Sequence, residues 1–484
     1  MTQGAESESV MRCISLLLGL WITTLAWSQT TITRADLAVR LLEAEACWEA
    51  HRQSPEARLR ATRPLTEGLT AFFSGRLDVL ARQLTLACLA LRSDAAPTPE
   101  QLYAGSLGVR LPRVFRHEAL EQGEQTVQCQ LFAFYPAERP EIGLQLHWAV
   151  LRVGDSKLLR EGTLDSPEVG ATLTLLSRAP EGDYEVVFAL KQGDQTLRQW
   201  RQPFSIIRQL DTRLQALDRA AETHDDADPT ERMTVLNAVE VLQNALKGEN
   251  PETFYPMLRL LQLAEQLSAG WERGQSGWRA APGDYWMATL YRERKVAFRL
   301  FVPPQFQPNK PIPLVLALHG AGGNEHLFFD GYGLGIILKE AAKRGWAVIA
   351  PRSDANLAHV AGALEAAQQL LPVDRKRIYL MGHSMGGAQS FAAIAQFPDE
   401  FRAAVIFAGA GQPTQVPADL PMLMVVGEQE LPILKSNIEN AYRRLQGMNL
   451  KTLEYKRYDA CDHIMIVREA MPDAFVFLER APAR

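Results

Sequence analysis

The hydrophobic pattern changes along the chain and divides its first half into three regions. At 31–95, apolar residues recur every three or four positions, which predicts a helical region. Short alternating runs separated by Gly, Pro and Asp follow at 105–207, and they predict a small β-sandwich domain of the immunoglobulin-like type. Helical spacing returns at 208–270, where we expect a second helical region.

The second half has a different texture, in which apolar runs of strand length alternate with helical patterns. The run Pro313 to Leu318 is continuously apolar, as expected for a strand that is buried on both faces. A linker rich in Gly and Trp precedes this region. The alternation predicts an α/β fold for a catalytic domain at 284–484.

One turn in this α/β region carries a candidate nucleophile. Gly382-His383-Ser384-Met385-Gly386 follows a short apolar strand and precedes an Ala-rich stretch that favours a helix. Strand, tight turn and helix are the context of a nucleophile elbow, which predicts Ser384 as the catalytic serine. The free N–H groups at the start of the helix would point at the charge that develops on an attacked carbonyl.

A serine hydroxyl needs a base, and the base needs an orienting acid. In an α/β hydrolase the chain order is serine, acid, histidine. His463 is the only histidine after the serine, so it is the predicted base. The loop after the strand Met422 to Val426 offers Glu430 as the preferred acid and Glu428 as its rival. Two further carboxylates close to the histidine in sequence stay open as alternatives: Asp459 and Asp462.

The oxyanion hole is predicted from the loop His319-Gly320-Ala321-Gly322-Gly323, which follows the first buried strand. In this fold one donor comes from that loop and the other from the residue after the nucleophile. We therefore expect the backbone N–H groups of Ala321 and Met385 to bind the oxyanion. For His319 and His383 we expect structural or pocket-lining roles.

The stretch Val373 to Gly387 resembles the secreted esterases of the α/β-hydrolase superfamily, in particular the group of polyhydroxybutyrate depolymerases, feruloyl esterases and acetylxylan esterases. The loop at 319–323, the loop at Gly427 and the pair Asp462-His463 match in the same order. The resemblance covers 284–484 and departs from the family at the acid, where the family has an aspartate. It implies a serine carboxylic ester hydrolase that acts on bulky or polymeric esters, such as a polyester or a polysaccharide ester.

Short connections support the same substrates. Little sequence separates Phe397 from the strand at Ala403, or Ala410 from Met422, so no large lid is inserted there. An open cleft would admit a polymer. The amphipathic stripes of the first helical region, by contrast, are expected to serve packing.

Composition and the N-terminus bound the compartment and the partners. The chain has 484 residues, 47% hydrophobic residues and a net charge of −5 with both signs mixed, which gives no indication of a nucleic-acid partner. A basic residue, an apolar run from Ile14 to Trp27 and small residues predict a signal peptide at 1–28, hence an exported protein with no stable membrane span after its removal. Cys47 and Cys88 are predicted on neighbouring helices, either bridged or as free thiols. We expect no cofactor and no metal.

Two other functions remain open at this point. A serine peptidase of the prolyl-oligopeptidase kind also has a β region before its hydrolase domain, although the region here is too small for a propeller. A catalytically inert binding protein is the second alternative, and the glutamate at position 430 is its support.

Overall fold

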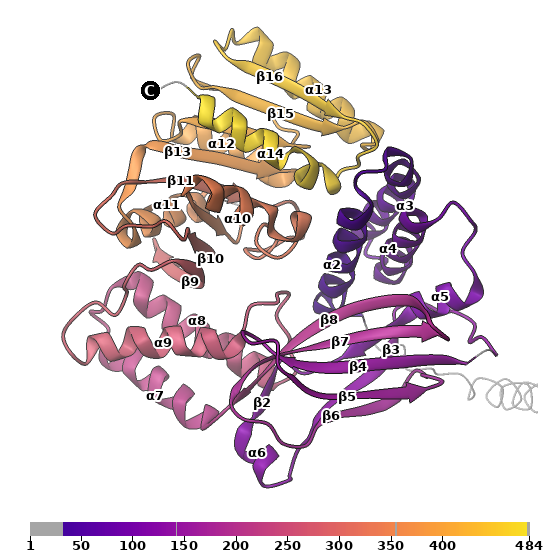
Figure 1. Cartoon of the computed structure of the whole chain (residues 1–484). Helices are drawn as coiled ribbons and strands as arrows, with labels where there is room; N and C mark the ends of the chain where they lie inside the picture. The colour runs from indigo at the N-terminus through magenta and orange to yellow at the C-terminus, as the bar shows by residue number, and fades with distance from the viewer. Residues whose placement is uncertain (1–31, 142, 354–355, 482–484) are drawn as a thin grey trace, which may run out of the picture. The chain divides into compact units, whose positions relative to one another are not determined.

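The apolar runs of the C-terminal region form the centre of an eight-stranded sheet. The computed structural model describes residues 32–141, 143–353 and 356–481. Strand β11 (Ile312–Leu318) is buried at every position, as its unbroken apolar sequence predicts. The strand order is β16-β15-β14-β13-β11-β12-β10-β9 (Figure 1). The other strands are β9 (Gly283–Tyr291), β10 (Arg294–Val302), β12 (Ala347–Pro351), β13 (Val373–His383), β14 (Ala403–Phe407), β15 (Met422–Gly427) and β16 (Leu453–Tyr458).

Strand direction divides this sheet into a parallel part and an antiparallel edge. All pairs from β12 to β16 in the spatial order are parallel, whereas β10 pairs antiparallel with both β9 and β12. The carboxyl ends of the parallel strands therefore meet at one edge, where loops from distant parts of the sequence come together. This arrangement confirms the predicted α/β fold.

Four helices connect strands of this sheet, and a fifth, α14, follows the last strand. They are α10 (Tyr332–Arg344), α11 (Ala358–Leu370), α12 (Met385–Gln396), α13 (Pro432–Gly447) and α14 (Met465–Arg480). Helices α10 and α14 pack against each other over β12, β14 and β15. The start of α10 is irregular, because Tyr332, Gly333, Leu334 and Gly335 all have positive φ angles. The chain makes a left-handed turn there before it enters the regular helix.

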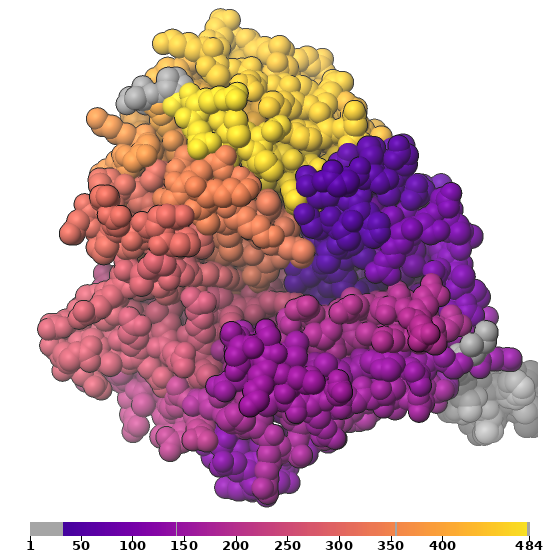
Figure 2. Space-filling model, viewed as in Figure 1, coloured from indigo at the N-terminus to yellow at the C-terminus, as the bar shows by residue number. Residues whose placement is uncertain are grey.

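The first helical region forms four helices: α2 (Arg34–His51), α3 (Pro55–Phe73), α4 (Leu77–Arg92) and the short α5 (Pro99–Ser106). Ser54 caps α3 by accepting a hydrogen bond from the backbone N–H of Ala57, and Pro55 occupies the first helical position. Figure 1 shows α2–α4 in indigo beside the yellow helix α14 at the other end of the chain, and in Figure 2 their surfaces adjoin.

The predicted β region contains two sheets. The larger has the order β2-β8-β7-β4-β5, and the smaller has the order β1-β3-β6. Their strands are β1 (Leu107–Arg110), β2 (Val114–Arg116), β3 (Val127–Ala133), β4 (Leu144–Arg152), β5 (Leu158–Asp165), β6 (Thr172–Leu176), β7 (Gly182–Gln192) and β8 (Gln195–Ile207), with the short helix α6 (His117–Glu121) after β2. Leu131, Val186 and Phe204 belong to one buried cluster shared by both sheets. The immunoglobulin-like assignment stays a prediction.

The second helical region comprises α7 (Leu210–Thr223), α8 (Pro229–Leu246) and α9 (Met257–Trp271). The linker that follows is fixed by the buried Glu231 of α8. This carboxylate accepts hydrogen bonds from the indole N–H of Trp271 at 2.7 Å and the backbone N–H of Trp278 at 2.8 Å. The linker is therefore part of the folded structure.

The helical regions and the C-terminal sheet share one hydrophobic core. Trp48 of α2, Leu242 of α8 and Phe407 of β14 belong to the same buried cluster, and residues 34–484 form one compact unit. The predicted domain boundaries are therefore not boundaries between separate cores, except for the two β-sheets. Cys47 and Cys88 are free thiols. The predicted signal peptide at 1–28 lies outside the described residues.

Candidate active site

The candidate nucleophile lies in a backbone turn that only this local sequence permits. Ser384 connects β13 to α12 with φ 54° and ψ −113°, a strained conformation for a residue with a side chain. A Cβ atom on Gly382 would lie 2.3 Å from the carbonyl oxygen of Gly386, and a Cβ on Gly386 would lie 2.1 Å from that of Leu318. Both glycines are therefore required for the close approach of strand and helix.

The three residues predicted as a triad form a continuous hydrogen-bonded chain. His463 Nε2 lies 2.9 Å from Ser384 Oγ, and His463 Nδ1 lies 2.7 Å from Glu430 Oε2. Glu430 follows β15 and His463 follows β16, so both loops lie at the carboxyl edge of the sheet beside the elbow. His463 and the Glu430 carboxylate are buried, whereas Ser384 is half-buried. A buried carboxylate that accepts from Nδ1–H leaves Nε2 free to accept the serine proton.

The other carboxylates considered from the sequence have different partners. Glu428 pairs with Lys435 at 2.5 Å, and Asp459 is exposed. Asp462 is buried and accepts a hydrogen bond from the backbone N–H of Met465 at 3.0 Å, so it fixes the first turn of α14. Burial raises the pKa of Asp462 to about 6. Among these candidates, Glu430 is the one that contacts the imidazole.

The two predicted oxyanion donors come from separate segments, the start of α12 and the loop after β11. Met385 is the first residue of α12, so its N–H has no partner within the helix. Ala321 lies on the loop after β11, where a turn is closed by a hydrogen bond from Gly323 N to Gly320 O at 3.0 Å. Ala321 and Ser384 line the same cavity. The oxyanion role of these two backbone N–H groups stays a prediction.

His383, beside the nucleophile, connects the base to the oxyanion loop. Its Nε2–H donates to the backbone carbonyl of His463 at 2.9 Å, and its Nδ1 accepts from the Tyr332 hydroxyl at 2.5 Å. Tyr332 in turn accepts from the backbone N–H of Gly320 at 3.4 Å. Burial lowers the pKa of His383 well below its usual value, so the ring is neutral. Sequence reasoning missed Tyr332, because nothing local distinguishes it from a core tyrosine.

His319 also has a structural position. Its Nδ1–H donates to the backbone carbonyl of Gly320 at 2.8 Å, and its Nε2 accepts from the backbone N–H of Ser353 at 3.0 Å. Burial lowers the pKa of His319 to about 4. The neutral ring therefore shapes the start of the oxyanion loop and is not placed to move a proton to Ser384.

Comparison with known proteins agrees with this fold. Residues 313–434 match the family described as the alpha/beta hydrolase fold. The C-terminal part of the chain is an α/β-hydrolase domain. Over 126 residues this domain is 29% identical to feruloyl esterase C of Emericella nidulans, a match that covers 23% of this chain and 45% of that relative. The chain thus spans less than half the length of the curated relative it matches.

Solved structures of similar proteins include two esterase-type hydrolases. The S-formylglutathione hydrolase of Staphylococcus aureus aligns with a TM-score of 0.35 and 16% identity, over 40% of this chain and 99% of its own. A thermostable esterase aligns with a TM-score of 0.38 and 15% identity, over 74% of this chain and 96% of its own. The strand order and the family match, rather than these alignments, carry the fold assignment.

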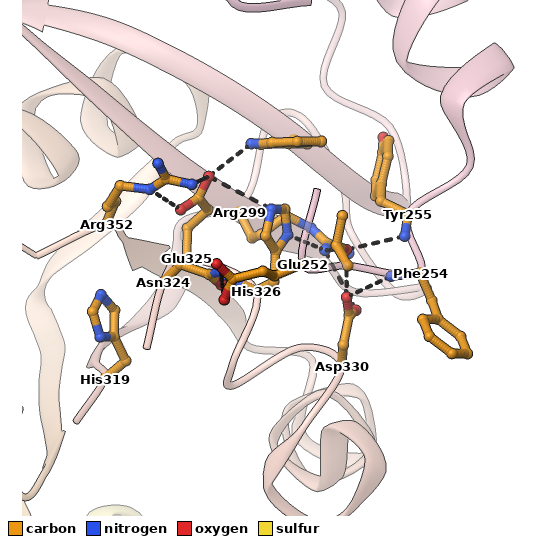
Figure 3. Close-up of polar contacts among 12 residues, drawn as sticks. Glu252, Phe254, Tyr255, Arg299, His319, Asn324, Glu325, His326, Asp330 and Arg352 are labelled. Carbon is orange, nitrogen blue, oxygen red and sulfur yellow. Dashed lines mark hydrogen bonds and ion pairs between the residues drawn. The ribbon is translucent and has the colours of Figure 1, made fainter. Parts of the chain in front are cut away.

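A buried polar network holds the oxyanion loop of the hydrolase domain (Figure 3). Glu325 is fully buried and accepts from Arg352 at 2.6 and 3.1 Å and from the indole N–H of Trp286 at 3.1 Å. Arg299 lies 2.8 Å from His326 Nδ1, and burial together with this guanidinium lowers the pKa of His326 well below its usual value. Because buried charges need partners, the network fixes the loop that carries Ala321.

Ser384 lines a cavity of about 190 Å³, and part of the cavity wall comes from the N-terminal helices α2–α4. Leu37, Leu41 and Leu42 of α2 line it, together with residues of α3 and α4. From the sequence, packing is the expected role of the amphipathic stripes of these helices, and the expected active site is an open cleft. Packing holds for Trp48, but the other face of α2 forms part of the active-site wall. Sequence reasoning missed this role because the helices lie about 300 positions before the serine.

In the described part of the chain, His, Cys, Asp and Glu side chains do not gather in groups of three that could hold a metal ion. Across the same residues, every helix is too short or too polar to cross a membrane.

Proposed function

We propose that the chain is a serine carboxylic ester hydrolase. The single observation that carries the proposal is the hydrogen-bonded chain from Ser384 through His463 to Glu430, located at a strained elbow. The order of the three residues along the sequence is the order of the α/β hydrolases. The similarity of the hydrolase domain to a feruloyl esterase supports the same reaction class.

The proposed reaction proceeds in two halves. The Ser384 hydroxyl attacks the acyl carbonyl while His463 Nε2 takes its proton, and Glu430 stabilises the resulting imidazolium. The N–H groups of Ala321 and Met385 stabilise the oxyanion of the tetrahedral intermediate. The intermediate collapses, His463 returns the proton to the departing alcohol, and an acyl-enzyme remains. Water then attacks the acyl-enzyme with His463 again as the base, which releases the acid and restores Ser384.

The test is hydrolysis of p-nitrophenyl acetate by the full chain and by Ser384→Ala. We expect kcat/KM to fall by about 10⁴-fold or more, because removal of the nucleophile disables the whole triad. Ser436→Ala, on α13, is the control and should retain activity. A fluorophosphonate probe should label the wild type and not Ser384→Ala. Equal hydrolysis by wild type and Ser384→Ala would exclude the proposal.

We also propose export of the mature enzyme. The support is the apolar run from Ile14 to Trp27 with a basic residue before it and small residues at its end. Determination of the N-terminal residue of the protein secreted by an expressing cell would test it. A mature N-terminus near 29 is expected, and an intact N-terminus retained inside the cell would contradict it.

A further inference from the structure

The cavity at Ser384 has an apolar wall that belongs to the N-terminal helices. Apart from Arg34 at the start of α2, the side chains that face it from these helices are aliphatic or aromatic. They include Leu41 from α2, Leu65, Leu69 and Phe72 from α3, and Leu84 from α4. Ser384, His463 and Ala321 line the same cavity. An apolar group attached to a carbonyl at Ser384 could therefore be buried against these helices.

The charged residues around the cavity are already paired within the protein. Arg34 donates to Glu252 through two hydrogen bonds, at 2.7 and 2.9 Å. Asp330 accepts from the backbone N–H of Phe254 at 3.1 Å and from Arg299 at 3.4 Å. A charged or heavily hydroxylated substrate group would have to compete with these pairs. The wall thus favours an uncharged, apolar group.

The wall is fixed to the catalytic machinery by contacts on both sides. Arg468 of α14 binds Glu49 of α2 at 2.6 and 2.9 Å, and the backbone N–H of Gly333 donates to Glu45 at 2.8 Å. At the oxyanion loop, a Cβ on Gly322 would lie 2.1 Å from the ring of Phe72. Helices α2 and α3 therefore contact the oxyanion loop and the first turns of α10 and α14.

We infer that α2–α4 form the acyl-binding wall of the active site and that the substrate is a monomeric ester with an apolar acyl group of medium length. This inference rests on the proposed function. The acyl group, rather than the alcohol, is assigned to the wall because it stays bonded to the serine while the alcohol leaves to water. A volume of about 190 Å³ is below the ~300–1,000 Å³ of drug-sized sites and suits one alkyl chain or one aryl ring.

The test compares kcat/KM for p-nitrophenyl acetate, butyrate and octanoate, with methyl ferulate as the aryl arm. Burial of each added methylene should raise kcat/KM by up to about fourfold, so octanoate should exceed acetate by at least about tenfold. Leu41→Trp fills part of the cavity and should reduce the octanoate-to-acetate ratio of kcat/KM by about tenfold. Leu59→Trp is the matched control, because Leu59 is 51% exposed on α3 and is not part of the wall. It should leave the ratio unchanged.

A second variant covers the case in which the tryptophan prevents folding. Leu41→Ala enlarges the cavity and should move the preferred acyl length upward, from octanoate toward dodecanoate. Failure of this inference is distinguishable from failure of the proposed function. Two results overturn the acyl-binding wall alone while acetate hydrolysis still depends on Ser384. One is a kcat/KM that does not change with acyl length, and the other is an octanoate-to-acetate ratio that both Leu41 variants leave unchanged. Absence of acetate hydrolysis by the wild type overturns the proposed function. A dependence on alcohol length instead of acyl length also overturns the assignment.

Discussion

The hydrolase domain and the N-terminal helices contribute to one site in opposite ways. In the hydrolase domain, the residues of the proposed reaction lie in short motifs. The glycines close to Ser384 in sequence permit the backbone conformation of the elbow. The helices α2–α4 have no motif, and their contribution is a set of apolar side chains that are useful only where the fold puts them. The difference teaches that the reaction class depends on residues close together in the sequence, whereas the substrate class depends on residues far from them in the sequence.

Separation of the two regions should have the largest effect. We expect the fragment 280–484 to be insoluble or unfolded, because its core is shared with residues such as Trp48 and Leu65. Removal of the helices would expose this apolar surface and leave Arg468 without its carboxylate partner. Soluble yield and circular dichroism of the fragment, compared with the full chain, measure the effect. A folded fragment with full activity on p-nitrophenyl acetate would show that the regions are independent.

The orienting acid gives the next largest effect and concerns the hydrolase domain alone. Glu430→Gln keeps the shape of the side chain but favours the wrong imidazole tautomer, so kcat should fall by roughly 10²–10⁴-fold. Glu428→Gln is the matched control two positions away, where the carboxylate pairs with Lys435 instead. Steady-state kinetics on p-nitrophenyl acetate measure both variants. Similar losses in the two variants would mean that Glu430 has no special role.

The junction between the regions should show a smaller effect on stability. The indole N–H of Trp48 donates to Glu469 at 2.9 Å, so Trp48→Phe should lower the free energy of unfolding by about 1–3 kcal/mol beyond the lost ring area. Urea denaturation measures the change. Trp200→Phe is the control, because the indole nitrogen of this buried residue has no hydrogen-bond partner among the residues that the structure describes. If the control loses as much stability, the Glu469 contact contributes nothing.

The smallest effect is a pH dependence at the same junction. Burial raises the pKa of Glu45 from about 4.5 to about 8, and Asp462 adds to the shift while Arg468 opposes it. The folded protein then binds more protons than the unfolded chain between these values, so stability falls as pH rises from 4.5 to 8.

Glu45→Gln should remove this part of the fall. Between pH 5 and pH 8 the decrease in Tm should be about 2 °C smaller than in the wild type, measured by differential scanning calorimetry. Glu222→Gln, on the exposed face of α7, should keep the wild-type slope. An unchanged slope in Glu45→Gln would contradict a carboxyl that is protonated on folding.

The elbow and the chain order of the candidate triad could be predicted because they depend on local geometry. The elbow is marked by Gly382 and Gly386, and a single histidine follows Ser384 in the sequence. Few assignments of the nucleophile and its base are therefore possible. The bounds of strand β8 could not be predicted, because Gln and Arg interrupt the apolar pattern across Gln195–Ile207. The left-handed turn at Tyr332 was also missed, since its contact with Glu45 joins residues 288 positions apart. Interactions of that range have no signature in a single sequence.

The contact between Trp48 and Glu469 joins residues 421 positions apart, and it borders the loop of His463. Such a high contact order predicts slow folding, because the ends of a long polymer must meet before these contacts form. A ribosome-bound chain that has not reached His463 already contains the helices of the acyl-binding wall but lacks the proposed base. Hydrolytic competence would therefore arise only once the segment with His463 has been made, well after the helices that line its cavity.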